Sequence, residues 1–336
     1  MNDVFAEAME QLLNDRCTPA RIRLIEQGGD TATLWAELQA SGFADALLPE
    51  SAGGAGLALL ECFSIVFACG RHALPLPFAH TLLVRGLCAT QNLPAGPIGI
   101  AGSARRHADG GIDCPQVPFG RVCDWVLAEL DAGAFLLPCS SAIRTSEAGH
   151  GSLDATLHWS TLPDAAIRLN DKVQGWRKVA AIACAALLAG TQQRILEMTL
   201  AYANDRSQFG KPIGKFQAVQ QQLSVMAEHV FAAKMAAQIG FDSGTGVPSE
   251  LCAAVAKARA GEAAPIVAAI AHAVHGAMGF TEEYDLQLYT RRLHDWRMAY
   301  GSELYWQGQL GNAALQSHAA RAVDFIRQEI TAGQRA

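Results

Sequence analysis

Two long helical patterns joined by an unusual connector constrain this chain more than any other feature. Apolar residues at helical spacing predict one helix from about Trp176 to Asn204 and a second from about Phe216 to Gly240. Further helices are predicted over Ser249–Ala277 and over Leu286–Ala314. Four long helices with short connections predict a helical bundle in the C-terminal part of the chain, residues 173–336.

The connector between the first two helices carries more chemistry than a turn requires. It reads Arg206-Ser-Gln-Phe-Gly-Lys-Pro-Ile-Gly-Lys-Phe-Gln217, although Gly and Pro alone could join two packed helices. The Arg206 guanidinium can bind pyrophosphate oxygens in a bidentate way. Phe209 can cover a ring, and Gln208 and Gln217 can hydrogen-bond ribose or adenine. The simpler interpretation of Arg206 alone is a cation that favours a helix C-terminus.

A second glycine-containing segment follows the third helix of the bundle. It reads His275-Gly-Ala-Met-Gly-Phe-Thr-Glu-Glu-Tyr284, and Gly276, Ala277 and Gly279 permit close approach of a ligand to the backbone. The simpler interpretation is a helix C-cap and a turn. The dinucleotide fingerprint GxGxxG is absent, which argues against a Rossmann site.

The rest of the chain predicts a helical segment and then a small β segment. Residues 1–92 show helical apolar spacing, interrupted by the Gly-rich loop around Pro49–Gly56. Residues 93–172 contain short apolar runs bounded by Pro, Gly and Asp, which predict strands. The order helical, β, helical predicts a mainly α protein with three domains.

Composition excludes several classes of function. The net charge is −6 and only 17% of the residues are charged, so no nucleic-acid-binding surface is predicted. No apolar run reaches the roughly 18 residues of a membrane span, and the N-terminus lacks the pattern of a secretion signal. Nine cysteines without a CxxC pair indicate reduced, buried thiols, a cytoplasmic location and no metal site.

The two glycine-containing segments, in this order and between these helices, resemble the acyl-CoA dehydrogenase family. The string Leu48-Pro-Glu-x-x-Gly-Gly54 is similar to that family too, and the resemblance covers nearly the whole chain. It implies an N-terminal helical domain, a small middle β domain and a C-terminal four-helix bundle. It also implies FAD, an acyl-CoA substrate, an electron-transfer flavoprotein as acceptor, and a dimer or tetramer. The residues that would hold the ADP half of FAD across a subunit interface are Arg206, Gln208, Phe209, Phe216, Gln217, His275, Gly276 and Ala277.

The chain departs from this family where the catalytic base should lie. The reaction removes a weakly acidic α proton, which requires a well-placed carboxylate. Counting from the second segment puts the usual glutamate at Tyr300, and a phenol with a pKa near 10 is a poor base at neutral pH. The alternative position on the first bundle helix falls near Ala180. Glu303 and Asp295 are the remaining weak candidates.

The middle segment lacks the Thr-Glu-Pro-x-x-Gly-Ser-Asp-like string with which the family contacts the flavin ring. The base and the ring contacts are therefore missing, whereas the ADP segment is kept. The stretch Thr290–Gly301 looks like the base-lacking subunit of heterotetrameric bacterial acyl-CoA dehydrogenases acting on steroid side chains. Our hypothesis is that a paralogous partner supplies the catalytic glutamate and the flavin-ring pocket.

Two alternatives remain open from the sequence. The chain could be a self-sufficient homomeric dehydrogenase with Glu303, Asp295 or another carboxylate as base. It could also be a non-catalytic scaffold that binds no flavin. Arg291 and Arg292 are interpreted as surface or interface salt-bridge residues, and His272 with His275 does not predict a metal site because no carboxylate pair accompanies them.

Overall fold

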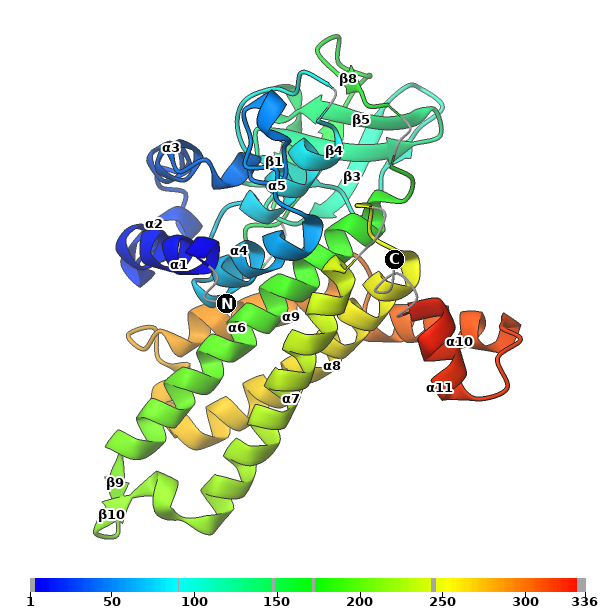
Figure 1. The fold of residues 1–336 in the computed structure, drawn as a ribbon. Helices are drawn as coiled ribbons and strands as arrows, with labels where there is room; N and C mark the ends of the chain where they lie inside the picture. Colours follow the sequence, from blue (N-terminus) through cyan, green and yellow to red (C-terminus); the bar gives the residue numbers. More distant parts are fainter. Residues whose placement is uncertain (1–3, 90, 147–148, 171–172, 243–245, 331–336) are drawn as a thin grey trace.

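The computed structural model describes residues 4–89, 91–146, 149–170, 173–242 and 246–330. Its N-terminal part is helical (Figure 1). Thr18 caps the second helix, since its hydroxyl accepts the Arg21 amide at 3.3 Å and Pro19 takes the first helical position. The elements are α1 (Val4–Arg16), α2 (Pro19–Glu26), α3 (Ala32–Ala40), η1 (Phe43–Asp45), η2 (Glu50–Ala52), α4 (Leu59–Arg71) and α5 (Phe78–Leu87).

The middle part is built from two four-stranded sheets, in the orders β1-β4-β5-β8 and β2-β3-β7-β6. Strand β1 pairs parallel with β4, and the other pairs of neighbouring strands described in the two sheets are antiparallel. Apolar residues of both sheets form a separate small core that includes Trp159 and Phe135. The elements are β1 (Ile98–Ile100), β2 (Arg105–Arg106), β3 (Ile112–Val117), β4 (Trp125–Leu130), β5 (Gly133–Pro138), η3 (Cys139–Ser141), β6 (Ile143–Thr145), β7 (Ala155–Trp159) and β8 (Ile167–Arg168).

The C-terminal part is a bundle around one central helix (Figure 1). Its 30-residue helix α6 is buried over most of its length, because α4, α7, α8 and α9 all pack against it. The elements are α6 (Trp176–Asp205), β9 (Ser207–Gln208), β10 (Lys211–Pro212), η4 (Ile213–Lys215), α7 (Gln217–Phe241), α8 (Glu250–His275), η5 (Gly276–Phe280), α9 (Leu286–Met298), α10 (Glu303–Gln316), α11 (Ala322–Phe325) and a π-helical turn η6 (Ile326–Ile330).

Two glycines allow α4 and α6 to cross closely. A Cβ atom on Gly70 would collide with the Leu187 carbonyl oxygen, and one on Gly190 would collide with the Phe67 carbonyl oxygen. Glycine is therefore required on both helices at this crossing. The close contact fastens the N-terminal helices to the centre of the bundle.

The predicted fold class is confirmed, but one predicted helix is wrong. The pattern over Leu286–Ala314 is split into α9 and α10 by a turn at residues 299–302. Tyr300 and Gly301 have positive φ angles of 59° and 106°, which a continuous helix does not allow. The predicted domain boundary at residue 172 lies outside the described residues.

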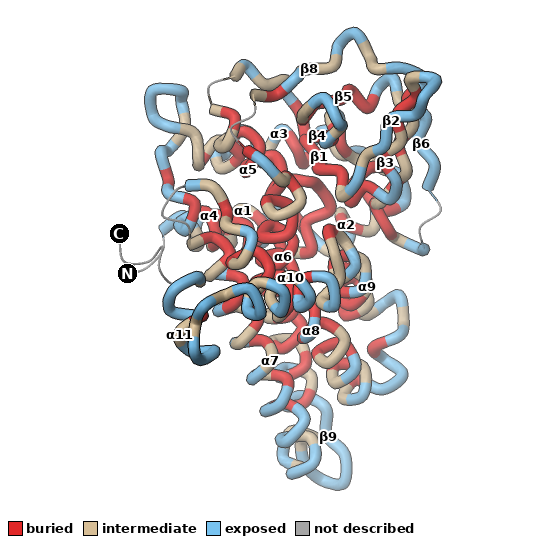
Figure 2. Tube along the Cα trace, turned by 90° about the vertical axis from the view of Figure 1, so that its right-hand side faces the viewer, coloured by how far each residue is buried: buried red, intermediate tan, exposed pale blue. Residues whose placement is uncertain are grey.

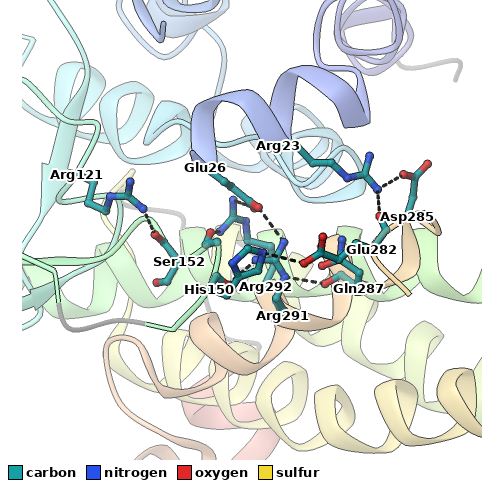
Figure 3. A network of polar contacts seen from close by, with 11 residues as sticks. Arg23, Glu26, Arg121, His150, Ser152, Glu282, Asp285, Gln287, Arg291 and Arg292 are labelled. Atoms are coloured by element: carbon teal, nitrogen blue, oxygen red, sulfur yellow. Dashed lines mark hydrogen bonds and ion pairs between the residues drawn. The ribbon is translucent and has the colours of Figure 1, made fainter. Parts of the chain in front are cut away.

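An ionic junction joins the three parts of the chain (Figure 3). The Glu26 carboxylate of α2 accepts from Arg291 and Arg292 of α9, at 2.8 Å in each case. The same two guanidiniums donate to the carbonyl oxygens of His150 and Gly151 in the middle part. The expected salt bridges of Arg291 and Arg292 thus exist, and the one made by Arg292 is buried.

Two described helices are long and apolar enough to cross a membrane, Trp176–Asp205 and Glu250–Phe280. The apolar window of the first is 89% buried inside the protein, as expected of a core helix, and that of the second is 39% buried. Length and composition are thus weak evidence for a membrane span in either helix.

Candidate functional site

The connector Arg206–Gln217 forms the far tip of the bundle (Figure 1). Strands β9 and β10 pair Gln208 with Lys211, which leaves Phe209 and Gly210 as a two-residue turn. Both turn residues have positive φ angles, 51° and 81°, as the tightest hairpin turns require. Phe209 is 91% exposed. A phenylalanine that is both conformationally unfavourable and exposed contributes nothing evident to the chain's own packing.

Cationic and aromatic groups gather at this tip. The Lys211 ammonium lies 4.4 Å from the centre of the Phe216 ring, and the Phe209 ring meets Phe216 edge-on at 6.2 Å. Within the part of the chain that the structure describes, no acidic side chain forms an ion pair with Arg206, Lys211 or Lys215. Cations without an ion-pair partner, beside the exposed Phe209 ring and the half-buried Phe216 ring, suit a ligand that is anionic and flat.

The second predicted segment lies at the same end of the bundle. Tyr202, one turn before Arg206 on α6, stacks on the His275 ring with centroids 4.4 Å apart and donates to the His275 carbonyl oxygen at 3.4 Å. Gly276 has a φ of 59° and a ψ of −142°, and a Cβ there would meet no atom within 4 Å. The open backbone of Gly276 thus follows directly after a residue that contacts the last turns of α6, the helix that leads into the connector.

The His275 side chain does not face this open surface. Its Nδ1–H donates to the Ala271 carbonyl at 2.8 Å, and its Nε2 lies 3.2 Å from the Tyr284 hydroxyl. Burial lowers the pKa of His275 below its usual value, so the ring stays neutral. Only the backbone of His275 is left for a ligand. Tyr202 and Tyr284 hold this ring. The sequence assigned neither a role: Tyr202 lies outside both segments, and Tyr284 ends the second segment without a distinctive pattern of its own.

Tyr300, at the predicted base position, is a buried plug. It is 5% exposed, and its hydroxyl donates to the Ile100 carbonyl oxygen at 2.9 Å. Its ring packs edge-on against His80 at 5.5 Å, and His80 packs edge-on against Phe119 at 5.7 Å. The Phe119 ring in turn lies tilted against Trp296 at 6.1 Å. We call His80, Phe119, Trp296 and Tyr300 the aromatic plug. It joins all three parts of the chain.

No member of the plug can serve as a base. Burial raises the pKa of the Tyr300 phenol well above its usual value, so it stays protonated. Burial also lowers the pKa of His80 to about 3, which leaves the ring neutral and a very weak proton acceptor. The alternative position at Ala180 is a fully buried alanine. Neither of the family's base positions holds a carboxylate.

The first weak candidate, Glu303, is tied to an arginine. Both carboxylate oxygens of Glu303 accept a hydrogen bond from Arg297 Nε, at 3.1 and 3.0 Å. Arg297 Nη2 also donates a hydrogen bond to Glu303 Oε1. These bonds hold the pKa of Glu303 below its usual range. Lys257, fully buried on α8, donates to the carbonyl oxygens of Arg297 and Gly301 at 2.7 and 2.9 Å. Glu303 thus belongs to a clamp on the α9–α10 turn.

The second weak candidate, Asp295, faces a different space. It lines a cavity of about 250 Å³ together with Asp154, Gln116 and His294, and Tyr300 is not among the lining residues. Burial raises the pKa of Asp295, and burial together with Asp295 raises the pKa of Asp154 to about 7. Raised pKa values favour a role in proton transfer, but both carboxyls lie in a cavity that Tyr300 does not line.

The groove beside the plug is lined mainly by polar groups of the chain itself. It has a volume of about 360 Å³ and is lined by Gly102, Glu129, Arg177 and Tyr305, among others. Arg177 donates to the Gly102 carbonyl at 3.2 Å and lies over the Tyr305 ring. Glu129 accepts the first two amides of α6, those of Gly175 and Trp176. No described residue here recreates the missing ring-binding string.

A small β domain lies between two helical domains in the chain, and the exposed connector lies at one end of the bundle. This arrangement is the acyl-CoA dehydrogenase fold. One chain of the ChsE4-ChsE5 complex from Mycobacterium tuberculosis superposes with a TM-score of 0.81 at 24% identity, over 94% of this chain and 97% of that one. The Tcur3481-Tcur3483 steroid ACAD G363A variant gives a TM-score of 0.78 at 25% identity, over 92% and 96%.

Sequence comparison points the same way. Residues 177–322 match the family described as acyl-CoA dehydrogenase, C-terminal domain. The chain is 28% identical to acyl-CoA dehydrogenase IpdE2 of Mycolicibacterium smegmatis over 302 residues, which cover 87% of this chain and 92% of the relative. The chain is therefore similar to acyl-CoA dehydrogenases over most of its length, and its residues 177–322 match the C-terminal domain of that family. The predicted family is confirmed.

Proposed function

We propose that this chain is the non-catalytic subunit of a heteromeric, FAD-dependent acyl-CoA dehydrogenase. It holds the ADP half of FAD, while a paralogous partner supplies the glutamate base and the pocket for the flavin ring. One observation carries the proposal: the base position is filled by the buried Tyr300 plug, whereas the ADP segment is exposed and has unpaired cations.

The residues at the tip fit the ADP half of the cofactor. Arg206 and Lys211 offer positive charge to a pyrophosphate, and Phe209 offers an exposed ring face to adenine. Gln208 and Gln217 offer amides, and the open backbone of Gly276 admits close approach. Bound FAD supplies the acceptor for the hydride that leaves the acyl group. The chain's own part in the reaction is to hold and orient that cofactor from its ADP end.

The residues at the chain's own ring position do not fit. The aromatic plug and the pair Arg177–Tyr305 occupy that region, and the carboxylates that line the described groove, Glu129 and Glu250, stand at neither of the two base positions. We therefore place α-proton removal and hydride transfer in the partner. We propose an acyl-CoA with a steroid-linked acyl group as substrate, because a structural relative is named as a steroid ACAD. An electron-transfer flavoprotein is the proposed acceptor and the cytoplasm the proposed location.

The test compares the chain alone with the chain co-expressed with a paralogue that retains the glutamate. We expect the isolated chain to be colourless and the complex to be yellow, bleaching on addition of an acyl-CoA. Arg206→Ala and Phe209→Ala should each lower the flavin content of the complex at least tenfold.

The matched controls are Arg105→Ala, at an exposed arginine in β2, and Phe231→Ala, at a phenylalanine of α7 that is 57% exposed. Both should leave the flavin content unchanged. An isolated chain that holds one FAD per subunit and is reduced by an acyl-CoA would make the self-sufficient enzyme correct. A colourless complex with every tested paralogue would favour the scaffold.

A further inference from the structure

Two of the nine buried cysteines of this chain meet in the small core of the β domain. The Sγ atoms of Cys123 and Cys139 lie 3.6 Å apart, and the two residues are 1% and 2% exposed. A disulfide bond requires its sulfur atoms to lie about 2.05 Å apart. A combined movement of about 1.5 Å would therefore bring this pair to bonding distance.

The two cysteines lie at the ends of neighbouring strands, where the backbone can adjust. Cys123 comes just before β4, and Cys139 begins the short turn η3 directly after β5. Trp125 of β4 pairs with Pro138 of β5. Beyond that pair, the Cys139 amide donates to the Asp124 carbonyl oxygen at 2.8 Å. The two backbones are therefore held at the spacing of neighbouring strands, which a disulfide bond can span.

The two thiols differ in acidity. The hydrogen bond with Cys123 holds the pKa of Cys139 below its usual value against the effect of burial, and the Arg144 guanidinium lowers this pKa further. The same hydrogen bond, together with burial, raises the pKa of Cys123. A thiolate is the nucleophilic form of cysteine, so Cys139 is the more reactive member of the pair. Burial raises the pKa of all the remaining cysteines: Cys17, Cys62, Cys69, Cys88, Cys114, Cys184 and Cys252.

The pair lies just beneath an exposed edge of the β domain. Arg144, whose guanidinium donates to the Cys123 carbonyl oxygen at 2.9 Å, belongs to the edge strand β6, and all three residues of β6 are exposed. Figure 2 shows this strand at the surface. Ser140 and Ser141, the residues that follow Cys139, are exposed too. Local opening of this edge would admit a molecule as small as a peroxide without unfolding the helical bundle.

We propose that Cys123 and Cys139 are a reversible oxidation site, at which hydrogen peroxide converts the two thiols into a disulfide. Disulfides of proteins in reducing compartments are commonly transient and redox-sensing, which agrees with thiols that are free in the resting chain. This inference is independent of the proposed function, because it concerns thiols and requires neither the flavin nor a partner subunit.

The reaction takes place in two steps. The Cys139 thiolate attacks one peroxide oxygen, the O–O bond breaks, and the hydroxide that leaves takes up a proton to become water. Cys139 is then a sulfenic acid. The Cys123 sulfur attacks the sulfur of this sulfenic acid, and the Cys123 proton leaves with the displaced hydroxide as a second water. Two thiols are thus oxidised to one disulfide, and one peroxide is reduced to two waters.

The disulfide would fasten a turn that belongs to the aromatic plug. The Cys123 amide donates to the Phe119 carbonyl oxygen at 3.1 Å, so the thiol and this plug residue lie on one tight turn. Joining Cys123 to Cys139 ties that turn to the end of β5. The bond also closes the loop of residues 123–139, which restricts the unfolded chain. The oxidised chain should therefore unfold at a higher temperature than the reduced chain.

The first experiment identifies the oxidised thiols by mass spectrometry of the full-length chain. The reduced protein is treated with hydrogen peroxide at neutral pH, the reaction is stopped with catalase, and the remaining thiols are alkylated in denaturant. Trypsin cuts after Arg121 and Arg144, so Cys123 and Cys139 fall on one peptide, residues 122–144, which contains no other cysteine. We expect this peptide to appear without alkyl groups and lighter by two hydrogens.

The rate of this change decides the outcome. The peptide of residues 122–144 should lose its alkylation at least tenfold faster than any other cysteine-containing peptide. Equal rates for all the cysteines would overturn the proposal. A disulfide that appears only at denaturant concentrations that unfold the chain would also overturn it.

The second experiment tests which thiol is attacked first. Cys123→Ser keeps a hydroxyl donor beside Cys139 but cannot form the disulfide, so dimedone, which captures sulfenic acids, should label Cys139. In Cys139→Ser, the Cys123 thiol stays protonated and dimedone should not label it. Labelling of Cys123 alone would overturn the proposed order of attack.

The matched control is Cys114→Ala, at a third fully buried cysteine of the same small core. It should form the disulfide at the rate of the parent chain. The oxidised parent and the oxidised control should each melt a few degrees above their own reduced forms, and dithiothreitol should abolish that gain. Peroxide should give Cys123→Ser no such gain. Each variant is compared with its own reduced form, so a general loss of stability does not affect the result. An equal gain in Cys123→Ser would overturn the proposal.

Discussion

Glu26 and Arg292 form a buried ion pair between the first and the last helical domains, with Oε1 and Nη2 2.8 Å apart (Figure 3). Their side chains are only 5% and 3% exposed. A buried pair of this kind makes the relative placement of two domains depend on one carboxylate. Arg291 shares the carboxylate, and both arginines also hold the loop at His150 and Gly151. Domain docking and loop position are therefore coupled.

Glu26→Gln should destabilise the chain strongly. The substitution leaves the Arg292 guanidinium buried without a counter-charge, which typically reduces the free energy of unfolding by about 3–5 kcal/mol. Denaturant unfolding at neutral pH measures the change. The matched control is Asp285→Asn, which breaks the more exposed Arg23–Asp285 pair and should change the free energy by about 0–1 kcal/mol. Equal losses in the two variants would contradict this prediction.

Asp154 should make stability fall as pH rises. Its pKa is about 7 in the folded chain because of burial and the nearby Asp295, and it returns to about 4 on unfolding. Between these values the folded state keeps a proton that the unfolded state has lost, so the free energy of unfolding decreases by up to about 1.4 kcal/mol per pH unit. Below the unfolded pKa the full contribution is present, and above pH 7 it is gone.

The matched measurement compares the parent chain with Asp154→Asn between pH 4 and pH 8. The asparagine cannot ionise, so the stability difference between the two proteins should change across this window in the variant's favour. Asp164→Asn, at an exposed position, should track the parent chain at every pH. A constant difference for Asp154→Asn would show that this carboxyl does not titrate differently on folding.

Tyr300→Phe should weaken the plug without affecting the proposed cofactor end. The variant loses the hydroxyl bond to the Ile100 carbonyl and leaves that oxygen buried, at a cost of about 1 kcal/mol. Tyr305→Phe, which removes a hydroxyl from a partly exposed contact with Arg177, should lose less. Urea unfolding of both variants measures the two losses in the free energy of unfolding. Flavin content of the heteromer should be unaffected by Tyr300→Phe.

Tyr300→Glu should not create a dehydrogenase. The carboxylate would enter a space closed by His80, Phe119 and Trp296, and burial would raise its pKa. The isolated variant should therefore be less stable and should not be reduced by an acyl-CoA when FAD is added. Flavin bleaching in this single variant would mean that the pocket is open enough for substrate and that only the base is missing.

Gly190→Ala should disrupt the crossing of α4 and α6. The added methyl would collide with the Phe67 carbonyl oxygen, and overpacking of this kind costs about 1–3 kcal/mol. The same exchange at Gly308, where a Cβ meets nothing, should raise monomer stability by about 1 kcal/mol. Opposite signs for one chemical change at two helical glycines are the expected result. Thermal unfolding at low protein concentration measures both.

The sequence predicts a candidate site best where the residues of that site are contiguous in the chain. The segment Arg206–Gln217 and the Gly276–Ala277 turn could be proposed as a binding site because their residues are close together in the chain and chemically distinctive. The missing glutamate at Tyr300 was found by counting within one family pattern. The order helical, β, helical followed from the periodicity of apolar residues. These features need no knowledge of tertiary contacts.

The rest depends on residues that are far apart in the chain. Tyr300 meets His80 across 220 positions, and no local pattern indicates that pairing. The α9–α10 turn was missed because helical spacing continues through it on both sides of Gly301. The buried pair of Glu26 with Arg292 was missed for a related reason. The sequence shows which residues are charged, but only the tertiary packing determines which of these side chains become buried.

Phe209 has a practical consequence for anyone who screens variants of this protein. Its ring contributes little to its own fold, so a substitution there would pass melting, solubility and secondary-structure assays unnoticed. If the proposed function is correct, the loss would become visible only in an assay that contains both the partner subunit and the cofactor. For this chain, a clean stability profile is therefore no guarantee that a variant still works.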